Sequence, residues 1–260
     1  MGQRLSRARA KIARAGIPFA IPGPEDWSAR LNSVLTVIYL IFNEGYRTSS
    51  GDSLVRVDLC DEAIWLARLV SGLVDDRAEP LGLLSLMLTT HARRGARIDP
   101  QGMAVALGEQ DRALWDRAMA DEGLTLLDTA LGCRRPGPFQ IKAAISALHV
   151  QAVRAEATDW RQMVLLYDAL LVHEPTPVVR LNRAVALHEA GTTAAARDEI
   201  DRLADNLGSY QPYHAARAEI LGRSGQRAAA RAAFETAIEL SQNPAERALL
   251  ARRRDRVTPA

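Results

Sequence analysis

The stretch Ala194-Ala-Ala-Arg197 recurs as Ala228-Ala-Ala-Arg231, and Gly191 recurs as Gly225, both displaced by 34 residues. A fixed period of this length is typical of chains built from stacked helical hairpins, in which each hairpin buries its apolar face against its neighbours. Small residues recur because the helices must approach one another closely at these positions. The period therefore predicts a helical scaffold in the C-terminal half of the chain.

Two units follow the spacing of tetratricopeptide repeats, which place small, glycine and aromatic residues at fixed positions. In the unit at 211–244 these residues are Ala218, Gly225, Ala230, Phe234 and Ala237; in the unit at 177–210 they are Ala184, Gly191, Ala196, Ile200 and Leu203. A third, degenerate unit is expected at 143–176, with Ala169 in the last small position, followed at the end of the chain by a capping helix, Ala245–Arg256. The expected fold is all-α, a helical bundle leading into a tetratricopeptide-like, right-handed stack of helical hairpins.

Upstream of the repeats, the apolar pattern predicts more helices and no strand. A basic helix at 2–15 precedes a proline-rich connector, and the next helix runs from Pro24 to about Asn43, before a loop at 45–53. Helices are also expected around 66–74, 80–94, 110–131 and 138–155; the first should bury Leu66, Leu69, Val70, Leu73 and Val74, and the last Ile141, Ala144, Ile145, Leu148, Ala152 and Val153. The domains expected are 1–17, 24–137 and 138–256.

Composition argues for a folded chain without a general attraction to nucleic acid. The 260 residues are 48% hydrophobic and carry a net charge of only +2. Cys60 and Cys133 are not in a metal-type or redox spacing, so both are expected to be buried free thiols in a reducing cytoplasm. The longest apolar run, Val34 to Phe42, is too short to span a membrane, and no signal peptide is evident.

Catalytic patterns are absent from the sequence. The five histidines are scattered without metal-ligand spacing, and neither a phosphate-binding glycine loop nor a serine elbow occurs. Neighbouring acidic residues such as Asp75 and Asp76 point about 100° apart on a helix, which does not suit a shared site. The sequence therefore predicts a protein that is not an enzyme, with no cofactor and no metal.

Several polar clusters stand out against this background, although structural networks explain each of them more simply than a ligand site does. Asn43, Glu44 and Tyr46 lie where an apolar helix is expected to end at Gly45, and the spacing of Asp111 and Trp115 places them on one face of the expected helix, with Arg112 and Asp116 beside them on another. The remaining candidates are a helix cap with an aromatic anchor and a pair in the first helix of a repeat: Asp159, Trp160, Asn182 and Arg183. Asparagine at the position of Asn182 tends to face the concave groove of such repeats.

Taken in order, these motifs resemble the C-terminal extension found in a group of bacterial extracytoplasmic-function RNA polymerase sigma factors. The resemblance covers essentially all 260 residues. It is carried by the basic helix and by the following segments: Ala15-Gly-Ile-Pro-Phe19, Tyr39-Leu-Ile-Phe-Asn-Glu-Gly-Tyr46, Gln110-Asp-Arg112 with Trp115-Asp116, Gly137-Pro-Phe-Gln140 with His149, Thr158-Asp-Trp160 and Leu181-Asn-Arg-Ala-Val185.

The resemblance implies a place for this chain in transcription initiation. In that family the extension follows one domain that reads the −10 promoter element and a helix-turn-helix that reads the −35 element. Residues 2–15 are similar to the last helix of the helix-turn-helix, so Arg4, Arg7, Arg9 and Lys11 would be remnants of DNA contacts. The chain is therefore expected to be a C-terminal piece of a longer protein, meeting promoter DNA only through the complete sigma factor.

The resemblance further implies a regulatory domain whose partners are RNA polymerase, the sigma factor's own promoter-reading domains or a separate regulator protein, with no membrane contact. Two other hypotheses remain open. One is a free-standing tetratricopeptide-type adaptor without a role in transcription. The other is a small-molecule sensor with a pocket near Tyr46, Arg112, Trp115 and Gln140.

Overall fold

A computed structural model describes residues 10–11, 14–15, 23, 26–48 and 55–257. These residues form twelve α-helices and no strand, apart from an isolated bridge between Ile98 and Ala104, so the expected all-α fold is confirmed. The chain divides into two compact units, Met1–Thr36 and Val37–Ala260. No helix in the described part of the chain is both long and apolar enough to cross a membrane.

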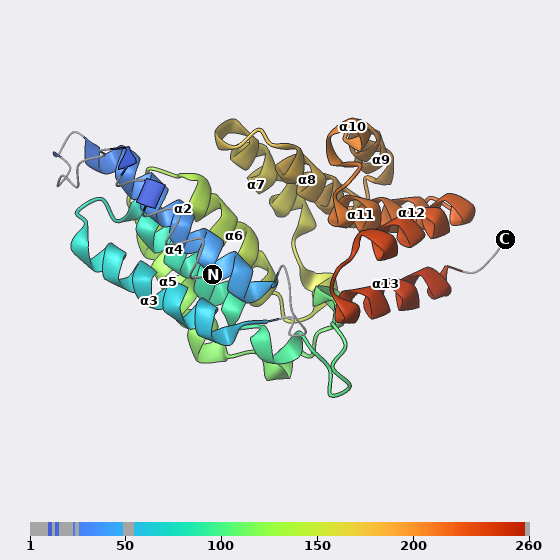
Figure 1. The fold of residues 1–260 in the computed structure, drawn as a ribbon, viewed down its shortest axis with the longest axis horizontal. Coiled ribbons are helices and arrows are strands. Elements are labelled where there is room, and N and C mark those ends of the chain that lie inside the picture. Colours follow the sequence, from blue (N-terminus) through green and yellow to red (C-terminus); the bar gives the residue numbers. More distant parts are fainter. Residues whose placement is uncertain (1–9, 12–13, 16–22, 24–25, 49–54, 258–260) are drawn as a thin grey trace. The chain divides into compact units, whose positions relative to one another are not determined.

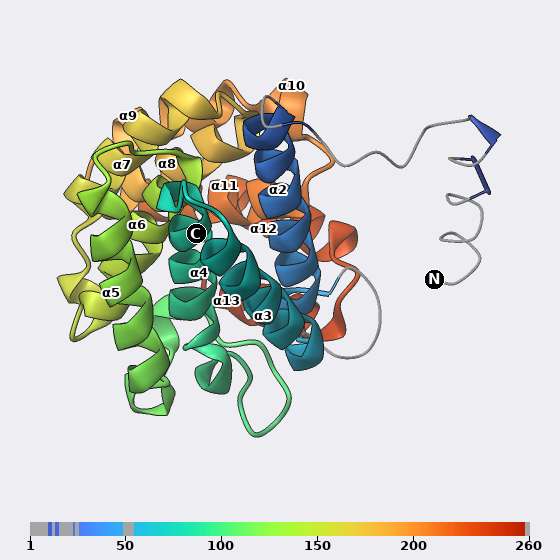
Figure 2. The ribbon, with the colours of Figure 1, turned by 90° about the vertical axis from the view of Figure 1, so that its left-hand side faces the viewer.

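The larger unit begins within α2 (Trp27–Tyr46) and continues as a bundle around one central helix. The bundle contains α3 (Val57–Leu73), α4 (Ala78–His91), α5 (Arg117–Gly132) and α6 (Pro138–Gln151). Twelve of the fourteen residues of α4 are buried, because its sequence is apolar on all sides and α3, α5 and α6 pack around it (Figure 2).

The remaining helices form consecutive hairpins, as Figure 1 shows in yellow to red. They are α7 (Trp160–His173), α8 (Pro177–Glu189), α9 (Thr193–Asp201), the short α10 (Ala204–Leu207), α11 (Gln211–Arg223), α12 (Arg227–Leu240) and α13 (Pro244–Arg256). Both helices of the hairpin α8–α9 recur 34 residues later in α11–α12, which confirms the period found in the sequence.

These hairpins have glycines in their turns and small buried residues in their helices, as the repeat predicts. Gly191 and Gly225 adopt φ of +87° and +76°, a left-handed conformation that residues with a side chain rarely tolerate. The small residues Ala184, Ala196 and Ala230 are completely buried, where the helices approach closely. The third unit departs from the pattern, because Ala169 is exposed and a longer connection with a short 3₁₀ helix joins α6 to α7.

The prediction of which face of α3 is buried is wrong. Leu69 and Leu73 are exposed, the latter by 71%, whereas the buried face consists of Cys60, Ala63 and Ala67 with Ile64 and Ser71. Small residues allow α3 to lie close to its neighbours, so the larger apolar side chains remain on the outside. The prediction that Val153 is buried is also wrong, because this residue follows the end of α6 and is exposed. Cys133, expected to be buried, is an exposed free thiol.

Two helix boundaries also differ from expectation. Gly45 does not end its helix; it lies within α2, where an added Cβ would come within 2.8 Å of the backbone nitrogen of Cys60. Glycine is therefore required there by the close approach of α3. Residues 110–116 are not part of α5 but form a 3₁₀ turn and a capping segment, so Asp111 and Trp115 do not share a helix face.

Candidate functional site

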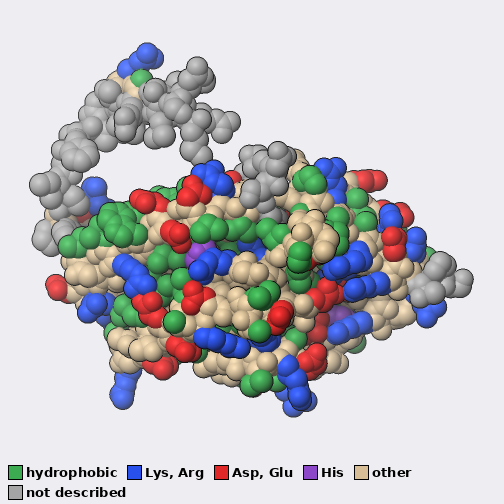
Figure 3. All heavy atoms as spheres, turned by 90° about the horizontal axis from the view of Figure 1, so that it is seen from below, with side chains coloured by type: hydrophobic (Ala, Val, Ile, Leu, Met, Phe, Trp, Pro, Cys, Tyr) green, Lys and Arg blue, Asp and Glu red, His purple; other side chains and the backbone are tan. Residues whose placement is uncertain are grey.

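A cavity of about 630 Å³ opens where the bundle meets the hairpins. Its walls come from the segment 106–112, the end of α6, the connection 155–158, the helices α7 and α8, and two arginines, Arg223 and Arg253. Figure 3 shows acidic and basic side chains interspersed with apolar ones over the face seen there, so neither sign of charge dominates it.

Four of the residues selected from the sequence meet at this cavity, although they come from four separate segments: Arg112, His149, Trp160 and Asn182. The rings of His149 and Trp160 pack edge to face, with centroids 5.4 Å apart. Arg112 donates from one guanidinium nitrogen to the carbonyl oxygens of His149 at 2.6 Å and of Ala152 at 2.8 Å. It thereby caps the C-terminal end of α6.

The cavity is electrostatically unusual at its His149 end. Burial, together with the positive charges of Arg93 and Arg112, lowers the pKa of His149 to about 4. Burial, together with Arg117 and Arg93, also holds the pKa of Arg112 below its ordinary value. The imidazole of His149 is therefore neutral at physiological pH.

Arg93 itself was not selected from the sequence. Its side chain is 7% exposed, its Nε is buried without a hydrogen-bond partner, and none of the carboxylates in the described residues forms an ion pair with it. Nothing in the run Ala92-Arg93-Arg94 distinguishes it, because burial of a charged residue depends on packing that the local sequence does not show.

The other residues around Arg112 are structural. Trp115 is buried, with the Arg112 guanidinium 4.4 Å from the centre of its ring. Asp111 accepts from the backbone nitrogen of Ala113, and Asp116 caps α5 by accepting from that of Met119. These carboxylates hold the 110–116 segment, and they do not line the cavity.

Of the four residues around which a pocket was expected, Arg112 lines this cavity, whereas Tyr46, Trp115 and Gln140 do not. The guanidinium of Arg97 stacks 3.6 Å above the Tyr46 ring. Asn43 and Glu44 lie beside Tyr46 in the last part of α2. Gln140 is completely buried and donates to the backbone oxygen of Arg135 at 2.8 Å.

In each of the last two pairs of candidates, one residue lines the cavity and the other does not. Asp159 accepts from the backbone nitrogen of Gln162 and caps α7, while its neighbour Trp160 lines the cavity. Arg183 forms ion pairs with Asp168 and Glu199, whereas Asn182 lines the cavity. Among the residues proposed as DNA contacts, Arg4, Arg7 and Arg9 lie outside the described part, and Lys11 lies in a short helical segment with its side chain exposed.

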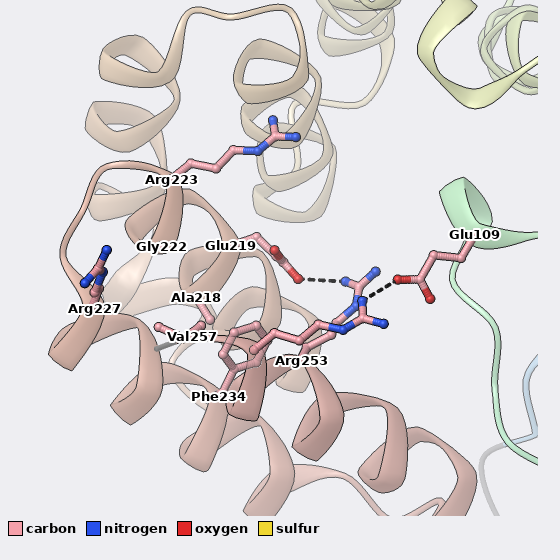
Figure 4. A pocket seen from close by; sticks show the side chains of 10 residues that line it. Glu109, Ala218, Glu219, Gly222, Arg223, Arg227, Phe234, Arg253 and Val257 are labelled. Atoms are coloured by element: carbon pink, nitrogen blue, oxygen red, sulfur yellow. Dashed lines mark hydrogen bonds and ion pairs between the residues drawn. The ribbon is translucent and has the colours of Figure 1, made fainter. Parts of the chain in front are cut away.

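A second, smaller cavity of about 410 Å³ adjoins the first and shares Arg223 and Arg253 with it. Figure 4 shows Arg253 of α13 beside Glu219 of α11, to which it donates a hydrogen bond at 2.8 Å. Arg256, also in α13, donates to Glu109 at 2.8 Å. Sequence analysis missed these residues because arginine is abundant throughout the chain. No group of three or more potential metal ligands gathers anywhere in the described residues.

Comparisons with known proteins give a relative but no activity. Residues 30–131 match a family of unknown function, DUF6596. An uncharacterized protein of Rhizobium meliloti (strain 1021) is 47% identical over 250 residues, which are 96% of this chain and 59% of that protein. The chain thus spans about three fifths of the length of this curated relative. No solved structure matches the chain.

Proposed function

We propose that this chain is the regulatory, protein-interacting part of a bacterial extracytoplasmic-function sigma factor. The observation that carries the proposal is the meeting of Arg112, His149, Trp160 and Asn182 at one cavity. Each belongs to a different motif of the resemblance, and a repeat scaffold commonly uses such a concave surface for binding.

The greater length of the Rhizobium meliloti relative supports the proposal, because it leaves room for domains outside the matched region. In this proposal those domains read the promoter, and the cavity face contacts them, RNA polymerase or a separate regulator. The helical hairpins provide a rigid surface for that contact, and the chain itself performs no chemical step.

The test is transcription in vitro by core RNA polymerase with the Rhizobium meliloti relative, on genomic DNA fragments whose transcript starts are mapped. The relative is used intact or without the region that matches this chain. We expect the intact protein to direct initiation at defined promoters, and removal of the region to change the yield at least about tenfold. The purified 260-residue chain, added separately, should reverse the change.

A matched pair of variants of the added chain locates the surface. Trp160→Ala changes the cavity wall, whereas Val172→Ala changes an exposed residue of the same helix away from it. Only the first should fail to reverse the change. An intact relative that starts no transcript would refute the sigma-factor proposal, and unchanged transcription after removal would refute the regulatory one.

A further inference from the structure

We propose that the outer face of α3 is a docking surface for a basic, amphipathic helix of a partner protein. The bundle buries the face of α3 that carries small residues such as Ala63 and Ala67. Most of the large apolar side chains of α3 lie on the opposite, exposed face, on the near side of the bundle in Figure 2. This goes beyond the proposed function, because it assigns the chain a second interaction surface that does not include the cavity.

The exposed side chains form one continuous row along α3. Residues four apart on a helix lie side by side, and every fourth residue from the first to the last of α3 is exposed. The row consists of Val57, Asp61, Trp65, Leu69 and Leu73, and its four apolar members are between 44% and 71% exposed. Partly buried apolar residues of the neighbouring row widen the apolar strip: Leu66, Val70 and Val74.

A row of this kind has the shape of one side of a helix–helix contact. Ridges of residues four apart pack into the grooves of a second helix, with the two helix axes crossing at about 50°. Single exposed apolar residues are common on monomeric proteins, but a contiguous apolar row with an aromatic residue at its centre is typical of an interface. Trp65 occupies that central place. The second helix is therefore expected to cross α3 at Trp65.

The charges along the row decide which helix fits. Asp58, Asp61 and Glu62 are exposed on or beside its first half, whereas Arg56 is the basic residue there and pairs with Asp58. Asp61 lies 3.2 Å from His91, but burial lowers the pKa of this imidazole, so it stays uncharged and does not neutralise the carboxylate. Three carboxylates against one guanidinium leave two negative charges in excess, which favours a helix with lysine or arginine beside its apolar stripe.

The same charges argue against two other occupants of this face. A second copy of the chain would bring the same carboxylates to the contact, and like charges across an interface weaken it. An anionic membrane surface would be repelled for the same reason. Farther along the helix, the charge of Arg68 is balanced by Glu122, with which it pairs. A basic helix is therefore the occupant that the surface fits best.

The experiment measures the binding of two labelled synthetic helices to the purified chain by fluorescence anisotropy at low salt. Both match the 17 residues of α3 in length and carry leucine along one face, with lysine at all other positions in one helix and glutamate in the other. We expect the lysine helix to bind at least about tenfold more tightly, because its charges complement those of α3. The chain as a whole has a net charge of +2, so general attraction to lysine would not produce this result. Equal affinity for the two helices, or no binding of the lysine helix at submillimolar concentration, would overturn the proposal.

Variants then locate the contact. Leu73→Gln and Leu165→Gln each replace a mostly exposed leucine, on α3 and α7 respectively. Only the first should weaken binding of the lysine helix, by at least about fivefold. Asp61→Asn combined with Glu62→Gln should remove most of the preference for lysine over glutamate. An equal loss in Leu165→Gln, or none in Leu73→Gln, would refute the proposal.

Two further measurements separate the other occupants. Sedimentation of the chain alone should show a monomer, and a dimer that Leu73→Gln converts to a monomer would mean that a second copy covers α3. Anionic phospholipid vesicles should not bind the chain through this face. Vesicle binding that Leu73→Gln abolishes would identify a membrane surface and refute the proposal.

Discussion

At the scale of single residues, His149 shows how a side chain in the larger cavity acquires its electrostatic properties from packing. His149 was selected from the sequence as part of a resemblance, but its properties come from neighbours that are distant along the chain, namely Trp160, Arg112 and Arg93. The sequence alone gives no means of predicting that two cations lie near this half-buried imidazole. Its low pKa is therefore a consequence of tertiary packing.

This low pKa predicts how stability depends on pH. The pKa of His149 is about 4 in the folded chain and lies near 6.5 in an unfolded one, so the unfolded state takes up the proton first as the pH falls. The stabilisation is present above pH 6.5 and is lost between pH 6.5 and 4, with a slope of at most about 1.4 kcal/mol per pH unit.

His149→Phe should therefore lose less stability than the original chain between pH 6.5 and 4.5, because it retains the ring contact with Trp160 but cannot take up a proton. Urea unfolding at several pH values measures the difference. Parallel curves for the two proteins over this range would contradict a lowered pKa at His149.

At the scale of elements, the start of α6 shows why Gly137-Pro-Phe-Gln140 is a recognisable motif. Glu79 of α4 accepts hydrogen bonds from the backbone nitrogens of Phe139 at 2.9 Å and Gln140 at 3.2 Å, and so caps α6 from another helix. A Cβ at Gly137 would come within 2.4 Å of the Glu79 carboxyl group, which explains the glycine. Pro138 occupies the first turn, where its missing N–H costs nothing.

Glu79→Ala should therefore lower the free energy of unfolding by about 1–2 kcal/mol, because it leaves backbone donors at the start of α6 without their partner. Urea denaturation followed by circular dichroism gives the value. Glu62→Ala, an exposed glutamate of α3, is the matched control and should change it by less than about 0.5 kcal/mol. A loss as small in Glu79→Ala would mean that this long-range cap is unimportant.

Individual helices also show which parts of the fold could be predicted from the sequence. The hairpins α8–α9 and α11–α12 were predictable, because their spacing by 34 residues is a local pattern repeated in the chain. The buried face of α3 was not, because the apolar period marks two faces there and the structure buries the one with Ala63 and Ala67. The apolar lining of the larger cavity was predicted only in part: Trp160 was a candidate, and Met163 was not.

At the scale of the unit Val37–Ala260, ion pairs near both ends of the last helix, α13, join it to segments that precede the hairpins. Near its start, Glu246 pairs with Arg47, which follows α2, and farther along, Arg252 and Arg256 pair with Glu109 at 3.0 and 2.8 Å. Glu109 directly follows the residues 106–108 that form one wall of the larger cavity. The pairs with Glu109 therefore hold that wall against α13.

These pairs are partly exposed, so each should contribute only about 0.5 kcal/mol to overall stability. Glu109→Gln should accordingly shift the unfolding free energy by no more than about 1 kcal/mol, yet it should free the cavity wall. Hydrogen exchange at the amides of residues 106–110 is expected to accelerate several-fold, while exchange in the buried helix α4 stays the same. Added salt should produce the same local change in the original chain, because screening weakens exposed ion pairs. Exchange that rises in both segments together would instead indicate global destabilisation, and unchanged exchange at 106–110 would show that the wall is held by packing alone.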